Sequence, residues 1–144
     1  MASVHDVAAY VLEKAGPMTA MKLQKLVYYS QAWSLVWDSR PLFPERIEAW
    51  ANGPVVRELY NKHRGQFEVS AWPDGDSSRL DATARETIDA VLGFYGPKSP
   101  QWLSDLTHLE DPWRQARRGT PDGEASCAEI TPAMLAEYYE GLQA

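Results

Sequence analysis

Three polar residues, His108, Glu110 and Asp111, form the only grouping in the sequence that resembles an acid–base or metal site. Their spacing argues against that chemistry, because residues i and i+2 of a helix do not face each other. No HExxH motif and no cysteine pair adds metal ligands. The alternative is structural: Thr107, His108 and Asp111 hydrogen-bond the backbone of a tight connection around a buried Trp113. We therefore predict no catalytic residue, no metal and no cofactor, and an enzyme using His108, Glu110 and Asp111 is the least favoured interpretation.

Other signatures of chemistry are missing as well. Asn52-Gly53-Pro54 lacks the further glycines and the lysine of a phosphate-binding loop. The one cysteine, Cys127, excludes an internal disulfide and indicates a free thiol in a reducing compartment. The N-terminus does not resemble a signal peptide, and no apolar run is long enough to span a membrane. We expect a cytoplasmic protein without a membrane partner.

Aromatic residues are more unusual, since the chain contains six Trp and seven Tyr. These types anchor protein–protein contacts, so we expect some of them to face a partner, with Trp33, Trp37 and Trp113 in the core. Lys22 and Lys25 fall in the early turns of a predicted helix, where the helix dipole does not favour cations. They are either ordinary solvated lysines or a cationic edge for an acidic partner. The candidate binding residues are Lys22, Lys25, Tyr28, Tyr29, Trp50, Arg57 and Tyr60.

Charge is unevenly divided along the chain. Residues 1–65 carry eight Lys and Arg against six Asp and Glu, whereas residues 66–144 carry six against fourteen. The acidic second half repels phosphate backbones, which argues against general nucleic-acid binding and favours a basic protein partner. A DNA-binding regulator remains the main alternative function. It would place Lys22, Lys25, Arg57, Lys62 and Arg64 on phosphates, but the predicted helix has too little polar surface to enter a groove.

The stretch from Met18 to Arg64 must organise the fold that positions these residues. Thr19 is suited to cap a helix that ends near Trp37. From Leu26 onward this helix is almost entirely apolar or aromatic, and its polar exceptions Gln24, Gln31 and Asp38 lie on one narrow stripe. We predict a buried central helix.

Helical periodicity and caps predict the remaining elements. Further helices are expected over residues 3–15, 54–64, from about 81 to 95, from 100, from 112 and from 132. Residues 46–50 suit either a helical turn or a short extended piece, residues 67–71 show a weak strand pattern, and residues 117–129 resemble a loop. We predict an all-α fold of about five to seven helices, with one short extended segment at most, in a single domain over residues 1–144.

Three sequence blocks in order, MKLQKLVYYSQAW, IEAWANGPVVRELY and LTHLEDPW, resemble the Panacea domain, also called the SocA-like or phage-associated GepA-like family. The resemblance covers roughly residues 19–117. The family's motif positions correspond here to Lys22, Leu23, Lys25, Leu26, Tyr28, Tyr29, Trp50, Gly53, Pro54, Val55 and Tyr60. We expect many of these to determine the fold, together with Trp33, Thr107, His108, Pro112 and Trp113.

The resemblance implies an antitoxin of a type II toxin–antitoxin system. Family members neutralise a cognate toxin encoded nearby by binding it directly, and one relative acts as an adaptor that delivers its toxin to a AAA+ protease. Neither role needs chemistry from the domain. A homodimer and a toxin–antitoxin hetero-oligomer both remain open. No appended DNA-binding module is evident, which places autoregulation in doubt.

Overall fold

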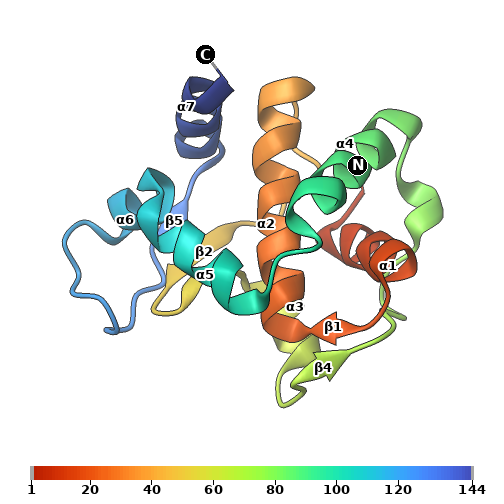
Figure 1. Ribbon diagram of the computed structural model, residues 1–144, viewed down its shortest axis with the longest axis horizontal. Helices are drawn as coiled ribbons and strands as arrows, with labels where there is room; N and C mark the ends of the chain where they lie inside the picture. Colours follow the sequence, from red (N-terminus) through yellow and green to blue (C-terminus); the bar gives the residue numbers. More distant parts are fainter. Residues whose placement is uncertain (1, 144) are drawn as a thin grey trace.

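Helix α2 (Ala20–Trp37) runs through the middle of the molecule and contacts α1 (Val4–Ala15), α4 (Ala82–Tyr95), α5 (Pro100–Leu109) and α7 (Pro132–Gln143). Figure 1 shows it as the upright helix between α4 and α1 on one side and α5, α6 (Asp111–Arg117) and α7 on the other. The computed structural model describes residues 2–143, so the two end residues of the predicted domain lie outside them. The fold is mainly helical, as predicted, around a buried central helix.

Local capping signals place most helix ends. The Ser3 and Asp6 side chains form a capping box at α1, and the Thr19 hydroxyl accepts the Lys22 N–H at the start of α2. Ser99 caps α5, with Pro100 in its first turn. The predicted starts of these helices are confirmed.

Two small antiparallel sheets accompany the helices. Strands β1 (Met18–Thr19) and β4 (Glu68–Val69) form one, and β3 (Gly53–Val56), β2 (Ile47–Trp50) and β5 (Glu129–Ile130) form the other in that order. A 3₁₀ turn covers Ser77–Arg79. Our expectation of one short extended segment at most was too low, and residues 46–50, which the pattern left open, belong mainly to β2.

The prediction that a helix begins at Pro54 is wrong. Residues Gly53–Val56 form β3, which pairs with β2 through a turn at Ala51 and Asn52, and helix α3 begins only at Arg57 and ends at His63. Asn-Gly between two apolar runs is a hairpin signal, which outweighs the preference of proline for a first helical turn. β3 is an edge strand, where the missing N–H of Pro54 is tolerated.

Two glutamines of α2 supply hydrogen bonds to neighbouring backbone. The Gln24 side chain accepts the Val56 N–H at 2.9 Å and donates to the Val56 carbonyl at 3.2 Å. Gln31 does the same for the Leu42 N–H at 2.7 Å and the Phe43 carbonyl at 2.9 Å. Both glutamines are buried, so the polar stripe of α2 binds the outer edge of β3 and the loop before β2.

Candidate functional site

The predicted binding residues differ in their burial. Lys25, Tyr28 and Tyr29 are at most 1% exposed, so the expectation that they reach the surface is wrong. Lys22 is half-buried and donates to the Gly96 carbonyl at 2.6 Å, at the C-terminal end of α4. The three other candidates come from the β2–β3 hairpin and α3. Arg57 is exposed, and Trp50 and Tyr60 are half-buried.

Lys25 is buried because its face of α2 packs on the outer edge of β3. Its ammonium group donates to the Pro54 carbonyl at 3.5 Å, and no carboxylate among the described residues pairs with it. Burial lowers the pKa of Lys25 to about 8. A Cβ at Gly53 would lie 2.8 Å from the Lys25 Cε, and the Gly53 φ of +122° is rare for other residues. Lys25 and Gly53 are therefore spatial partners in the packing of β3.

Tyr28 and Tyr29 point toward α7 and the α5–α6 connection. The Tyr29 and Tyr139 hydroxyls both donate to the Glu110 Oε1 at 2.7 Å, and the Tyr28 hydroxyl lies 3.1 Å from that of Tyr139. Burial raises the pKa of Glu110, although the two phenol donors partly oppose this effect. These aromatics hold α2, α6 and α7 together and do not form a surface.

The suspected His108, Glu110 and Asp111 grouping does not converge. His108 lies 2.7 Å from the Ser104 carbonyl through Nδ1, and its ring packs on Trp113, whereas Glu110 turns to the tyrosines and Asp111 is exposed. Within residues 2–143 no three His, Cys, Asp or Glu residues are placed to hold a metal ion. The structural alternative, in which these side chains hydrogen-bond the backbone around Trp113, therefore holds for His108. It does not hold for Asp111, whose side chain is exposed.

The remaining predicted motif residues contribute packing. Thr107 donates to the Ser104 carbonyl, and the buried Trp113 donates its indole N–H to the Trp50 carbonyl at 2.8 Å, which ties α6 to the hairpin. Pro112 is buried in the first turn of α6, and Leu23 and Leu26 are fully buried in α2. Two tryptophans differ from the expected core position. Trp33 is only half-buried, stacked on Trp37, and Trp37 is 45% exposed because it lies at the end of α2.

A groove of about 590 Å³ lies beside the hairpin, with Trp50, Arg57 and Tyr60 in its wall. The Trp50 and Tyr60 rings meet edge to face at 4.9 Å, and the Arg57 guanidinium lies 5.1 Å from the Trp50 ring centroid. The rest of the wall is mostly apolar or uncharged. It includes Met21, Gln24, Ala51, Asn52, Val55, His63 and residues 125–127. A second hollow of about 420 Å³ adjoins it, since Met21 and Asn52 line both.

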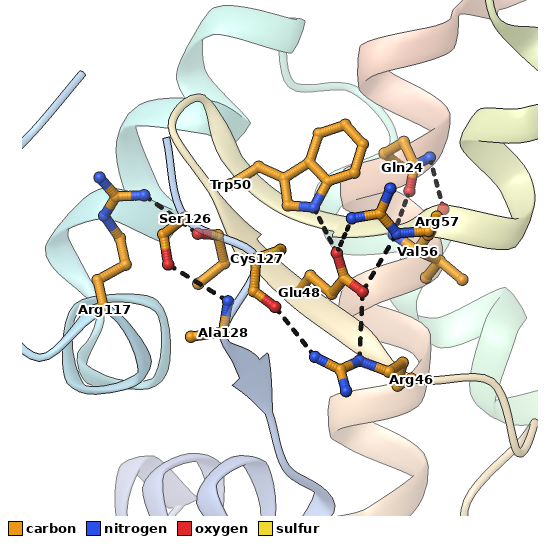
Figure 2. A network of polar contacts seen from close by, with 11 residues as sticks. Gln24, Arg46, Glu48, Trp50, Val56, Arg57, Arg117, Ser126, Cys127 and Ala128 are labelled. Carbon is orange, nitrogen blue, oxygen red and sulfur yellow. Dashed lines mark hydrogen bonds and ion pairs between the residues drawn. The ribbon is translucent and has the colours of Figure 1, made fainter. Parts of the chain in front are cut away.

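A buried carboxylate organises one wall of the groove, as Figure 2 shows. Glu48 accepts from the Trp50 indole at 2.8 Å, from Arg57 at 2.8 Å and from Arg46 at 3.2 Å. Arg46 also donates to the Cys127 carbonyl, which joins the hairpin to the loop before β5. Burial raises the pKa of Glu48, but the hydrogen bonds and charges of Arg57, Trp50 and Arg46 outweigh it and lower the pKa overall. Glu48 thus fixes the orientation of the Trp50 and Arg57 side chains.

Sequence reasoning missed Arg46, Glu48, Met21 and the loop residues of this site. Had residues 46–50 been interpreted as a strand, the i, i+2 spacing of Arg46, Glu48 and Trp50 would have placed them on one face. Nothing local marks residues 125–127, which reach the groove through the pairing of β5 with β2.

Comparison with known proteins gives one family. A family model described as "Antitoxin SocA-like, Panacea domain" matches residues 23–114. This segment contains the whole β2–β3 hairpin, α3 and most of α2. Searches of curated proteins and of solved structures returned no match. Among residues 2–143 no helix has both the length and the apolar character needed to cross a bilayer.

Proposed function

The chain belongs to the SocA-like antitoxin family with a Panacea domain, and from this we propose that it neutralises a cognate toxin by direct binding at the groove beside the β2–β3 hairpin. The observation that carries the proposal is the accessible Trp50, Arg57 and Tyr60 wall. Tryptophan, tyrosine and arginine dominate binding energy at protein interfaces. Glu48 preorganises two of these side chains, which reduces the entropy lost on binding.

The alternative of a DNA-binding regulator has less support. Four of its five phosphate-binding candidates are engaged within the fold. Lys25 is buried and Lys22 donates to the Gly96 carbonyl, while Arg57 pairs with Glu48 and Lys62 lies 3.6 Å from Asp74. The net charge of −6 further opposes binding to a phosphate backbone.

Coexpression tests the proposed function. The product of the neighbouring gene should arrest growth when expressed alone and be harmless together with this chain, with which it should copurify. The function would be refuted by a neighbouring product that is harmless alone, or by one whose toxicity persists in the presence of the wild-type chain.

A steric block tests the position of the binding site. Ala125 is exposed in the groove wall, so Ala125→Trp should fill the groove without disturbing the core and abolish neutralisation. Ala90 is exposed on α4 and lines no hollow described above, so Ala90→Trp is the matched control and should neutralise normally. Equal neutralisation by both variants would move the interface away from this groove.

The way in which binding neutralises the toxin can be measured separately. We propose occlusion, in which the toxin accumulates as an inactive complex. Delivery to a AAA+ protease would instead lower the amount of toxin on an immunoblot whenever this chain is present, and deletion of the protease would restore it.

A further inference from the structure

We propose that the groove selects a toxin segment in which a bulky apolar side chain stands next to a carboxylate. This inference rests on the proposed function and specifies the chemistry of the partner. It follows from the combination of an apolar wall with an uncompensated positive charge at one side of the groove.

The apolar part of the site comes from the hairpin, α2 and α3. Trp50, Tyr60 and Val55 line the groove together with Met21, which is 39% exposed. An apolar side chain that enters here exchanges water for aromatic and thioether surface. A polar side chain would lose its hydration, and the wall offers it few partners.

The positive charge comes from two arginines that share one carboxylate. Glu48 neutralises only one of Arg46 and Arg57, so the pair retains one positive charge beside the groove. Within residues 2–143, the Nη1 atoms of both arginines have no hydrogen-bond acceptor. Arginine binds carboxylates in a bidentate geometry, and these free N–H groups face solvent, since both side chains are about half exposed.

No carboxylate is among the residues that line the groove, and Glu58 acts on Arg57 from outside this lining. Gln24, Asn52 and Ser126 are uncharged, and burial lowers the pKa of His63, which keeps its imidazole neutral at neutral pH. A lysine or arginine in the bound segment would therefore meet a like charge, whereas an aspartate or glutamate would meet the arginines. The acidic surface elsewhere on the chain repels a carboxylate, so the groove is favoured over the rest of the molecule.

Blocked tetrapeptides test this selectivity on the intact chain without the toxin. The probes are acetyl-Ala-Trp-Glu-Ala-amide and its counterparts with Gln or Lys in place of Glu. Binding is followed by ¹H–¹⁵N spectra of the Trp50 indole N–H, assigned with Trp50→Phe. We expect the Glu peptide to bind about fivefold more tightly than the Gln peptide, with the Lys peptide weakest.

Two variants assign that preference to the arginine. Arg57→Gln should bind the Glu and Gln peptides equally. Arg40→Gln removes an exposed arginine that pairs with Asp81 and does not line the groove, so this variant should retain the preference. Thermal unfolding of both variants checks that they are folded. The proposal is overturned if the three peptides bind equally, if none binds, or if Arg57→Gln keeps the preference. These outcomes are independent of the coexpression result, which decides whether the chain neutralises a toxin.

Discussion

Lys25 shows how a single residue can have a different role from the one its charge suggests. A buried ammonium group with one long hydrogen bond loses most of its hydration, so the folded state disfavours its charged form. The burial that removes Lys25 from the interface therefore also makes it a source of pH-dependent instability.

Stability between pH 8 and pH 10 should rise because of Lys25. Its folded pKa of about 8 lies below the usual value near 10.5, so in this range the unfolded chain binds more protons than the folded one. The contribution of Lys25 to the free energy of unfolding should therefore increase with pH, by up to about 3 kcal/mol once both states are deprotonated. The buried Tyr28, Tyr29 and Tyr139 oppose it near pH 10, because burial raises their pKa values above those of the unfolded chain. The measurement is urea unfolding of the wild type and of Lys25→Met at several pH values.

Comparison with Lys25→Met isolates this residue, because the other titrating groups are common to both proteins. The variant should be at least as stable as the wild type at pH 7, and the difference should shrink toward pH 10. A constant difference across this range would contradict the buried ammonium.

Residue-scale burial was only partly predictable. The apolar pattern of α2 correctly placed Leu23 and Leu26 in the core, because helical periodicity is a local property. It did not place Tyr28 or Tyr29, since a phenol hydroxyl can be buried only where an acceptor exists. For Tyr29 the acceptor is Glu110, 81 residues away in the sequence.

At the scale of elements, the helices were predicted well and the hairpin was not. Helix ends depend on caps within a few residues, such as Ser3, Thr19 and Ser99. Strand β3 depends on partners outside itself, namely β2 and the side chain of Gln24. The groove is built on this hairpin. The sequence therefore predicted Trp50, Arg57 and Tyr60 as candidate residues but not the groove that they line.

Gly53→Ala tests the packing of the hairpin against α2. The positive φ and the 2.8 Å approach of the Lys25 Cε should together destabilise the protein by about 1–3 kcal/mol. Gly93→Ala is the matched control. Gly93 lies inside α4, and a Cβ added there would meet no other atom within 4 Å, so alanine should be neutral or stabilising by up to about 1 kcal/mol. Differential scanning calorimetry measures both, and equal effects would contradict the proposed constraint at Gly53.

At the scale of the whole molecule, charge and groove give complementary information. The acidic second half of the sequence predicts attraction of a basic partner at long range. The groove prefers a carboxylate at short range, because Arg46 and Arg57 share Glu48. A toxin that is basic overall and acidic at one contact would satisfy both conditions and be oriented as it approaches.

The single cysteine offers a footprint of the proposed binding face. Cys127 is exposed and lies in the groove wall, so a bound toxin should slow its reaction with maleimide at least about tenfold. Conversely, prior attachment of a bulky maleimide should prevent binding. Mass spectrometry of the chain with and without toxin follows the reaction.

Cys127→Ser provides the control for this footprint. It should bind toxin normally and be unaffected by maleimide. Unchanged reactivity of Cys127 within a stable complex would show that the toxin binds another face.

The outer edge of β3, which side chains of α2 cover, has a further consequence for solubility. An open strand edge is a template on which another chain can add a strand, which leads to domain swapping or aggregation. Here Gln24 binds both backbone groups of Val56, Lys25 approaches the Pro54 carbonyl, and the proline has no N–H to offer. Helix α2 thus occupies the place of a fourth strand, and other molecules can approach this hairpin only through its side chains.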